Sequence, residues 1–400
     1  MRIESVDFFY ASMPEITLDA DGSQDALLVR VRSGDDEGWG ECEASPITSI
    51  AAFAAPRSHG VCQPIGDSVL GQRLDSVADI ARITALVRRN SMDLLQAAHT
   101  FSGIEIALWD LLGRRFGEPV WRLLGGRRAH PKVPYASMLF GSDAQSTLEA
   151  VQDAVAAGFR AVKVGWGSFG QGSVEADADQ LAAAREGLGP DGFLLVDAGQ
   201  IWVDDVSAAA ARLPALQQAG ATWIEEPFLP LAYRAHAELS AQSNSVGVAG
   251  GEGAHSVHMA TNLIDYGAVR FVQIDTGRIG GIGPATEVAD YAAARDIAFV
   301  NHTFTSQLAL SASLQPFAAL ADHRICEFPF APSELARTIT SDRLEIDDGE
   351  LQPLDAPGLG LHVDLAAIKP YLHQVEILVD GRPLYADHHL GGTPVANSEP

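Results

Sequence analysis

The middle of the chain alternates short apolar runs with longer alanine-rich stretches. The apolar or β-branched runs begin at intervals of roughly 24–32 residues, the length of one strand, one helix and their loops. Eight such runs are present: VPYASMLF (133–140), AVKVG (161–165), FLLVDAG (193–199), TWIEEP (222–227), VGVAGGE (246–252), RFVQID (270–275), IAFVNHT (297–303) and HRICEF (323–328). The stretches between them are typical of helices, and several end in glycine, a helix C-terminal signal. Because no G-x-G-x-x-G follows the first run, this α/β repeat favours a parallel barrel over an open sheet.

The segments on either side of the repeat have other patterns. IESVDFFYA (3–11) and DALLVRVRS (25–33), followed by GDDEGWGEC (34–42), predict antiparallel strands with a turn. Between about residues 75 and 124 the pattern becomes helical, and short strands return after residue 341. We therefore predict four parts: an N-terminal α+β capping domain at 1–128, a barrel at 129–340, a C-terminal segment at 341–385 that returns to the cap, and a mobile tail at 386–400.

Carboxylates stand at the ends of three consecutive strands. The third strand ends in Asp197, the fourth in the pair Glu225-Glu226, and the fifth is followed by Glu252. A lone strand-end carboxylate is usually a turn former or a helix cap. In a parallel barrel, however, the C-terminal ends of neighbouring strands meet, so the three groups would repel one another unless a cation lies between them. An all-oxygen ligand set favours Mg²⁺ over zinc.

The next strand ends add groups suited to proton transfer. Asp275, His302 and Glu327 end the sixth, seventh and eighth strands. An aspartate beside a histidine can fix the imidazole tautomer and raise its basicity, as a general base requires. Lys163, inside the apolar second strand, is expected to point across the barrel as a buried ion partner.

Composition and charge restrict the possible partners. The formal net charge is −25, with 52 Asp and Glu against 27 Lys and Arg, which disfavours nucleic-acid and anionic membrane binding. The three cysteines are scattered without a C-x-x-C pair, and the first residues do not form the apolar core of a signal peptide. No apolar run is long enough to span a bilayer, so we expect a cytoplasmic protein that acts on a small molecule.

Together these motifs resemble the enolase superfamily, in its mandelate racemase-like branch. The resemblance covers nearly the whole chain and implies a modified (β/α)₇β TIM barrel with a capping module, and a homo-oligomer. It implies that Asp197, Glu225 and Glu252 are magnesium ligands, that His302 and Asp275 form the catalytic dyad, and that Glu327 hydrogen-bonds the substrate carboxylate. Members of this family remove the proton α to a carboxylate, and the metal and neighbouring cations bind the enediolate that forms.

Two positions depart from the family pattern. The second strand often carries K-x-K, whose first lysine corresponds to Lys163, but here Gly165 stands in place of the second lysine, a base on the face opposite His302. Gly199 stands where the family often has an asparagine. Since a racemase needs bases on both faces, we expect dehydration of a hexonate or hexarate to a 2-keto-3-deoxy acid, in which His302 acts alone or with Lys163. Cycloisomerisation of an acid sugar or its lactone, racemisation or epimerisation, and magnesium-dependent regulation without turnover are the alternatives.

Substrate choice is expected to depend on two loops of the cap, at residues 14–22 and 45–64. Arg57 and His59 in the second loop are candidate contacts for a distal carboxylate or hydroxyl group, with an exposed loop position as the competing interpretation. Gly165 and Trp166, at the end of the second strand, are candidate substrate-binding positions on the barrel side.

Overall fold

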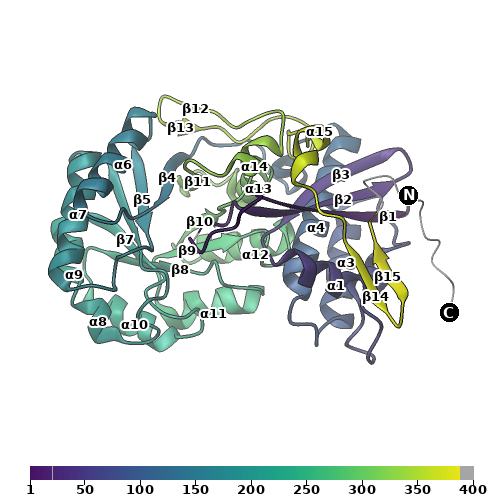
Figure 1. The fold of residues 1–400 in the computed structure, drawn as a ribbon, viewed down its shortest axis with the longest axis horizontal. Helices are drawn as coiled ribbons and strands as arrows, with labels where there is room; N and C mark the ends of the chain where they lie inside the picture. The colour runs from purple at the N-terminus through teal and green to yellow at the C-terminus, as the bar shows by residue number, and fades with distance from the viewer. Residues whose placement is uncertain (20, 388–400) are drawn as a thin grey trace.

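The computed structural model describes residues 1–19 and 21–387. Figure 1 shows the barrel on the left and the capping domain on the right, with the N-terminal strands crossing between them. Each part has its own buried apolar cluster, so the two form separate cores that meet along one junction. Among the described residues, no helix combines the length and the apolarity needed to cross a bilayer.

The capping domain packs a small antiparallel sheet against helices. Its strands pair in the order β1 (Ser5–Ser12), β2 (Asp25–Ser33) and β3 (Asp36–Cys42). The helices are α1 (Pro46–Ala54), α2 (Ile65–Val69), α3 (Val77–Asn90), α4 (Ala97–Phe116) and α5 (Val120–Leu123). The backbone of α4 lies so close to β3 that a Cβ added at Gly40 would be 2.1 Å from the carbonyl oxygen of Gly103. Glycine at this position therefore lets the helix cover the sheet directly.

The barrel contains eight parallel strands, which confirms the predicted strands and the fold class. They are β4 (Val133–Leu139), β5 (Ala161–Gly165), β6 (Phe193–Asp197), β7 (Ala221–Glu225), β8 (Gly247–Gly250), β9 (Phe271–Asp275), β10 (Ala298–His302) and β11 (Ile325–Pro329). Inward-facing side chains such as Tyr135, Leu195 and Trp223 fill the interior below the site. Outward-facing ones such as Val162 and Val164 pack with the helices in the larger core. This period of two places alternate residues of each strand at the barrel mouth.

Helices cover the outside of the barrel. They are α6 (Ala144–Ala156), α7 (Val174–Leu188), α8 (Val206–Ala210), α9 (Leu213–Gln218), α10 (Tyr233–Gln242), α11 (Val257–Gly267), α12 (Ile282–Ala293) and α13 (Gln307–Leu314), which continues into a 3₁₀ turn (Gln315–Phe317). Five of them begin after a side chain that accepts a hydrogen bond from a backbone N–H of the first turn: Asp143, Ser173, Asp205, Ser256 and Ser306.

A side chain joins the two end strands of the barrel sheet. The strand order runs from β10 to β4 and then to β11, so β10 and β11 are the sheet edges. The Oδ1 of Asn301 accepts a hydrogen bond from the backbone N of Glu327 at 2.8 Å, and its Nδ2 donates to the Glu327 carbonyl at 3.3 Å. The buried amide of Asn301 thus takes the place of backbone hydrogen bonds between β10 and β11, and it places His302 and Glu327 side by side at the rim of the barrel.

The C-terminal segment returns to the cap, as Figure 1 shows in yellow. It contains α14 (Glu334–Thr338), the hairpin β12 (Ile346–Asp347) and β13 (Glu350–Leu351), α15 (Leu365–Ile368) with a 3₁₀ turn (Lys369–Tyr371), and the hairpin β14 (Glu376–Val379) and β15 (Arg382–Ala386). The backbone N of His373 donates to the Tyr10 carbonyl at 2.8 Å. Of the tail predicted from residue 386, residues 388–400 lie outside the described residues. Ala386 ends β15 and Asp387 accepts a hydrogen bond from the Val375 N, so the boundary at 385 is too early.

The cap is attached to the loop that follows β9 and to the first turn of α12. The buried carboxylate of Glu105, on α4, accepts hydrogen bonds from the backbone N of Ile282 at 2.7 Å and of Gly283 at 2.9 Å. Burial raises the pKa of Glu105 to about 7, although the N–H donors favour its charged form. Ser102 accepts a bond from the Gly280 N at 2.8 Å, and the Glu43 N donates to the Gly277 carbonyl at 3.2 Å. These contacts hold the end of β3 over the barrel mouth.

Candidate active site

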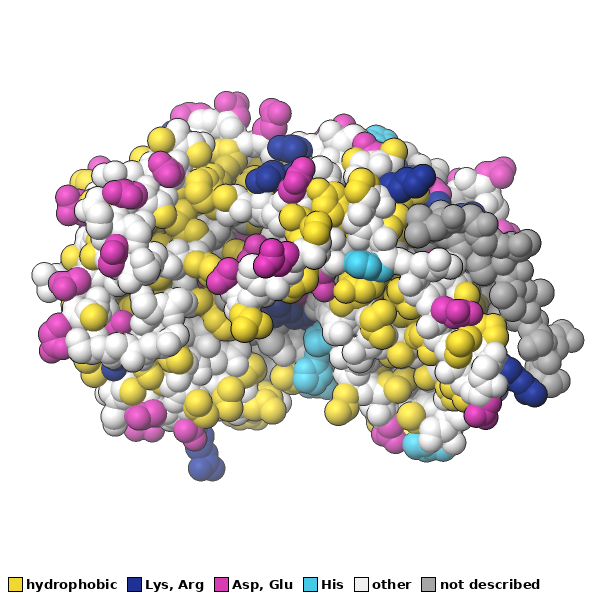
Figure 2. Space-filling model, viewed as in Figure 1, with side chains coloured by type: hydrophobic (Ala, Val, Ile, Leu, Met, Phe, Trp, Pro, Cys, Tyr) yellow, Lys and Arg dark blue, Asp and Glu magenta, His cyan; other side chains and the backbone are white. Residues whose placement is uncertain are grey.

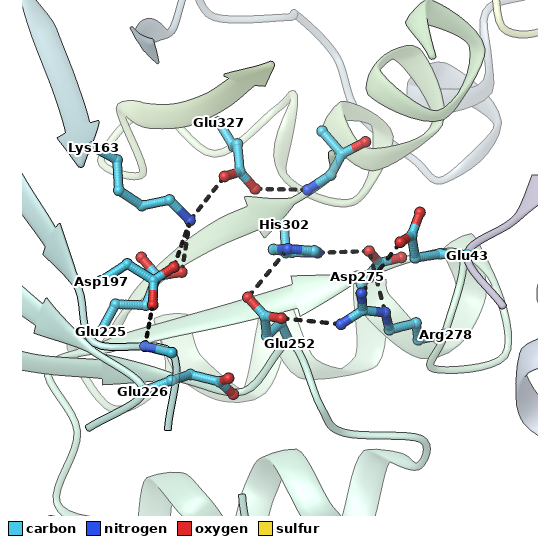
Figure 3. A network of polar contacts seen from close by, with 12 residues as sticks. Glu43, Lys163, Asp197, Glu225, Glu226, Glu252, Asp275, Arg278, His302 and Glu327 are labelled. Atoms are coloured by element: carbon cyan, nitrogen blue, oxygen red, sulfur yellow. Dashed lines mark hydrogen bonds and ion pairs between the residues drawn. The ribbon is translucent and has the colours of Figure 1, made fainter. Parts of the chain in front are cut away.

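Three carboxylates gather at the C-terminal ends of β6, β7 and β8. Asp197, Glu225 and Glu252 each offer one oxygen, and these oxygens lie within 4.8 Å of one another. The strand register places Asp197 directly beside Glu225, and Glu252 follows β8 by two residues (Figure 3). Burial raises the pKa of Glu225 well above its usual range, against the effect of Lys163. Three carboxylate oxygens form a hard, anionic donor set that fits a divalent cation such as Mg²⁺ better than a thiophilic metal.

Lys163 balances part of this negative charge from β5. Its Nζ lies 2.8 Å from Glu225 Oε1, 2.9 Å from Glu327 Oε1 and 3.4 Å from Asp197 Oδ2, all buried (Figure 3). Its ammonium therefore bridges the carboxylate cluster and the last barrel strand. A lysine held by three carboxylates serves as a positive charge, since removing its proton would leave those carboxylates without a partner.

His302 and Asp275 form a pair on adjacent strands. The register places His302 of β10 opposite Asp275 of β9, and His302 Nδ1 donates to Asp275 Oδ2 at 2.7 Å. The other ring nitrogen, Nε2, lies 3.1 Å from Glu252 Oε2. Burial alone would lower the pKa of His302, but the charges of Glu252 and Glu327 and the bond to Asp275 outweigh it and raise this pKa to about 10. The pair has the arrangement of an oriented general base.

Arg278 and Glu43 extend the network toward the cap, and the sequence patterns did not indicate either residue. Arg278 Nη1 lies 3.0 Å from Glu252 Oε1 and Nη2 lies 3.2 Å from Glu43 Oε1. Burial raises the pKa of Glu43 to about 7, although the positive charge of Arg278 acts in the opposite direction. Conversely, burial disfavours the charged form of Glu252, yet His302 and Arg278 lower its pKa to about 2. The sequence feature that could have indicated Arg278 is its position in the T-G-R run directly after the strand-end residue Asp275.

The site opens into a cavity of about 310 Å³, a size that admits a small acid. Glu252, Lys163 and His302 line it from the barrel, and Asp19, Asp21 and Glu43 line it from the cap. The first predicted cap loop, 14–22, therefore reaches the cavity. Gly22 of the same loop also lines the cavity, and the further lining residues that the sequence analysis missed are Ser137, Met138, Leu139 and Phe304.

The second predicted cap loop does not bring its candidates to this cavity, which corrects the expectation for Arg57 and His59. Arg57 Nε pairs with Asp67 Oδ2 at 2.5 Å, and its side chain is 69% exposed. His59 Nε2 pairs with Asp93 Oδ2 at 2.9 Å, also near the surface. Each residue has an acidic partner within the cap, and neither is among the residues that line the cavity.

Gly165 and Trp166 do line the cavity, at the end of β5. The register pairs Gly165 with Asp197, and a Cβ added at Gly165 would lie 2.5 Å from the Asp197 Cβ. Any side chain at this position would therefore displace a carboxylate of the cluster. Glycine in place of the second lysine of K-x-K is therefore required by the packing of Gly165 against Asp197.

Comparisons with known proteins agree with this geometry. Residues 11–125 match the family described as mandelate racemase/muconate lactonizing enzyme, N-terminal domain, and residues 146–367 match the family described as enolase C-terminal domain-like. A crystal structure described as a predicted mandelate racemase from Rhodobacter sphaeroides is 61% identical, with a TM-score of 0.93 over 96% of this chain and 99% of that chain.

Characterised relatives are more distant. The D-galactarolactone cycloisomerase of Agrobacterium fabrum is 29% identical over 86% of this chain and 90% of the relative. The L-talarate/galactarate dehydratase of Salmonella typhimurium is 30% identical over 74% of this chain and 71% of the relative.

Proposed function

Because the chain belongs to the mandelate racemase/muconate lactonizing enzyme family of the enolase superfamily, we propose that it removes the proton α to the carboxylate of an acid sugar and eliminates the β-oxygen. The first choice is dehydration of a hexonate or hexarate to a 2-keto-3-deoxy acid. The observation that supports the proposal is the proximity of two groups in one cavity: the His302–Asp275 pair and the carboxylate cluster, 3.1 Å apart at Glu252.

In this proposal the carboxylate cluster holds the cofactor. Asp197, Glu225 and Glu252 would hold Mg²⁺, and the ion would supply positive charge for the second negative charge of the enediolate. Lys163 adds a fixed ammonium beside Glu225 and Glu327. Stabilisation of a charge that develops only as the proton leaves lowers the barrier rather than the ground state.

His302 is the proposed base and Asp275 its orienting partner. The Asp275 contact fixes a proton on Nδ1. Nε2 pairs with Glu252, whose charge keeps this nitrogen protonated, and a cation held by Glu252 would offset that charge so that Nε2 could accept the substrate proton. After proton transfer, the same imidazolium can return its proton to the departing β-hydroxyl, as a syn elimination requires. Glu327 is proposed to accept a hydrogen bond from the substrate. Its Oε2 accepts from the Thr303 N at 2.7 Å, which fixes its orientation.

A related elimination is the second candidate. If the β-oxygen belongs to a ring, the same α-proton abstraction opens that ring without loss of water, which is a cycloisomerisation. The name of the A. fabrum relative, which this chain matches over 86% of its own length, favours this variant. Racemisation has less support because Gly165 stands in place of the second lysine of K-x-K, and Lys163 on the same strand is held as an ammonium by three carboxylates.

The test is a screen of acid-sugar stereoisomers and their lactones in D₂O with Mg²⁺, followed by proton NMR and a keto-acid assay. We expect a keto acid that EDTA abolishes and that His302→Asn reduces by about 10³-fold or more. His362→Asn is the matched control, since this exposed histidine pairs with Asp342 within the C-terminal segment, and His362 does not line the cavity. Persistence of the keto acid in His302→Asn would place the base elsewhere. If no candidate compound shows either proton exchange or a keto acid, the elimination proposal is contradicted.

A further inference from the structure

Two glycines on the β5–β6 side of the cavity let neighbouring side chains pack directly against the backbone. Gly165 cannot carry a Cβ because Asp197 is 2.5 Å from where it would lie. Gly199, with φ +55°, follows β6, and a Cβ there would lie 2.7, 2.9 and 3.1 Å from three ring carbons of Trp166. The indole therefore rests directly on the backbone of Gly199. Side chains at both positions are excluded by contacts that Trp166 and Asp197 already make.

Trp166 is held in an unusual backbone conformation at this place. Its φ is +56°, a left-handed value that is unfavourable for a bulky residue by about 1–3 kcal/mol. The Trp166 N donates to the Asp197 carbonyl at 3.3 Å, and the Trp166 carbonyl accepts from the Phe169 N at 3.4 Å. Strain of this kind persists where the surroundings fix it, and such residues are concentrated at functional sites.

The exposure of Trp166 separates it from the other tryptophans. All six tryptophans lie among the described residues, and Trp166 is 42% exposed whereas none of the other five exceeds 7%. An exposed indole that lines a cavity beside charged groups offers a flat apolar surface with little side-chain freedom to lose. The lining residues Met138 and Leu139 add apolar surface near the indole, whereas Lys163, Asp197, Glu252 and His302 line the charged part of the same cavity.

This division suits a ring better than an open chain. An open polyhydroxy acid directs hydroxyl groups to all sides, so packing it against an indole would leave some of them without hydrogen bonds. A ring fixes its carbons so that one face can present C–H bonds to the apolar wall while hydroxyl and carboxylate groups face the polar side. The ring also has fewer internal rotations to lose on binding.

We propose that Trp166 is the residue that selects a cyclic acid sugar, a sugar lactone or anhydro-sugar acid, by packing its indole against the ring. The proposal rests on the elimination chemistry proposed above. The C–H bond α to the free carboxylate breaks and its proton passes to His302. The bond between the β-carbon and the ring oxygen breaks, and that oxygen departs with the electron pair. His302 then returns its proton, so the resulting enol is an isomer of the substrate, and this enol tautomerises to the 2-keto-3-deoxy acid.

The kinetic test compares D-galactarolactone with open-chain galactarate on the Mg²⁺-loaded full-length protein. For Trp166→Ala we expect the KM for the lactone to rise about tenfold with kcat within about twofold of wild type, and the KM for galactarate to change by less than about twofold. Trp166→Phe should recover most of the difference. Leu229→Ala is the matched control, because Leu229 is 45% exposed but does not line the cavity. Equal changes for both compounds, or none for the lactone, would overturn the ring-selecting role.

A binding test separates this inference from the reaction. In a His302→Asn background, acrylamide quenching of tryptophan fluorescence reports mainly on Trp166, and a Trp166→Phe derivative identifies its contribution. We expect D-galactarolactone to protect this signal and galactarate to leave it unchanged. Protection without turnover by the wild-type protein would uphold the role of Trp166 and refute the elimination. Turnover without protection would uphold the elimination and refute the role of Trp166. If neither turnover nor protection is found, both the elimination and the role of Trp166 are refuted.

Discussion

Replacing Lys163 by methionine tests how the carboxylate cluster is stabilised. Lys163 Nζ contacts Glu225, Glu327 and Asp197 within 3.4 Å, and all four side chains are buried. Removing one partner of a buried ion pair leaves uncompensated charge and typically costs about 3–5 kcal/mol of the free energy of unfolding. We expect a loss of this size for Lys163→Met in EDTA. Saturating Mg²⁺ should restore part of it relative to wild type, because the cation replaces the missing positive charge. This gain comes in addition to the about 2.7 kcal/mol that a ligand present at about 100 times its Kd adds to every variant that binds it.

The assay is urea denaturation at neutral pH, with and without Mg²⁺. Lys132→Met is the matched control, since this buried lysine donates to the carbonyl oxygens of Phe317, Leu320 and His323, each at 2.9 Å. It should also destabilise the protein, but by an amount that Mg²⁺ does not change. If Lys163→Met in EDTA is as stable as wild type, or if Mg²⁺ restores both variants equally, Lys163 does not compensate the cluster.

Two further substitutions test the cluster itself. Glu252→Gln removes a carboxylate that contacts both His302 and Arg278, and isothermal titration should show Mg²⁺ affinity reduced at least about tenfold; unchanged affinity would exclude Glu252 as a ligand. Gly165→Ala places a methyl group 2.5 Å from the Asp197 Cβ, so we expect about 1–3 kcal/mol of destabilisation in urea together with weaker Mg²⁺ binding. Gly172→Ala, whose new Cβ would meet only Ala176 at 3.7 Å, should change neither quantity, and equal effects of the two glycine variants would refute the packing argument.

The fold and the barrel half of the site could be predicted because they depend on periodic local patterns. Each barrel strand is a short apolar run, and its last polar residue necessarily lies at the mouth of a parallel barrel. Asp197, Glu225 and His302 were predicted in this way, and the structure brings them together with Lys163. The alternation of side chains along β5 also predicted that Lys163 and Gly165 face the interior.

The cap half of the site could not be predicted because it depends on how two domains meet. Glu43 reaches the cavity through the junction at which Glu105 binds the first turn of α12, a contact between positions 177 residues apart. No local pattern encodes that distance. Arg57 was chosen for its charge and its loop, but a neighbouring carboxylate, Asp67, already pairs with it in the cap. Charge on a loop therefore did not establish that the side chain faces the site.

The balance of charge in the cavity connects the metal with the substrate. Acidic side chains are scattered over the visible face (Figure 2) and the formal net charge is −25, so the surface attracts an anionic substrate little. Within the network of Figure 3, carboxylates outnumber Lys163, Arg278 and His302, and those cations are already paired with them. A substrate carboxylate would add one more negative charge to a buried site, which is unfavourable without a compensating cation. A divalent cation at Asp197, Glu225 and Glu252 offsets two of those negative charges at the place where the substrate carboxylate would bind. On this argument the metal is a condition for substrate binding as well as for the chemistry.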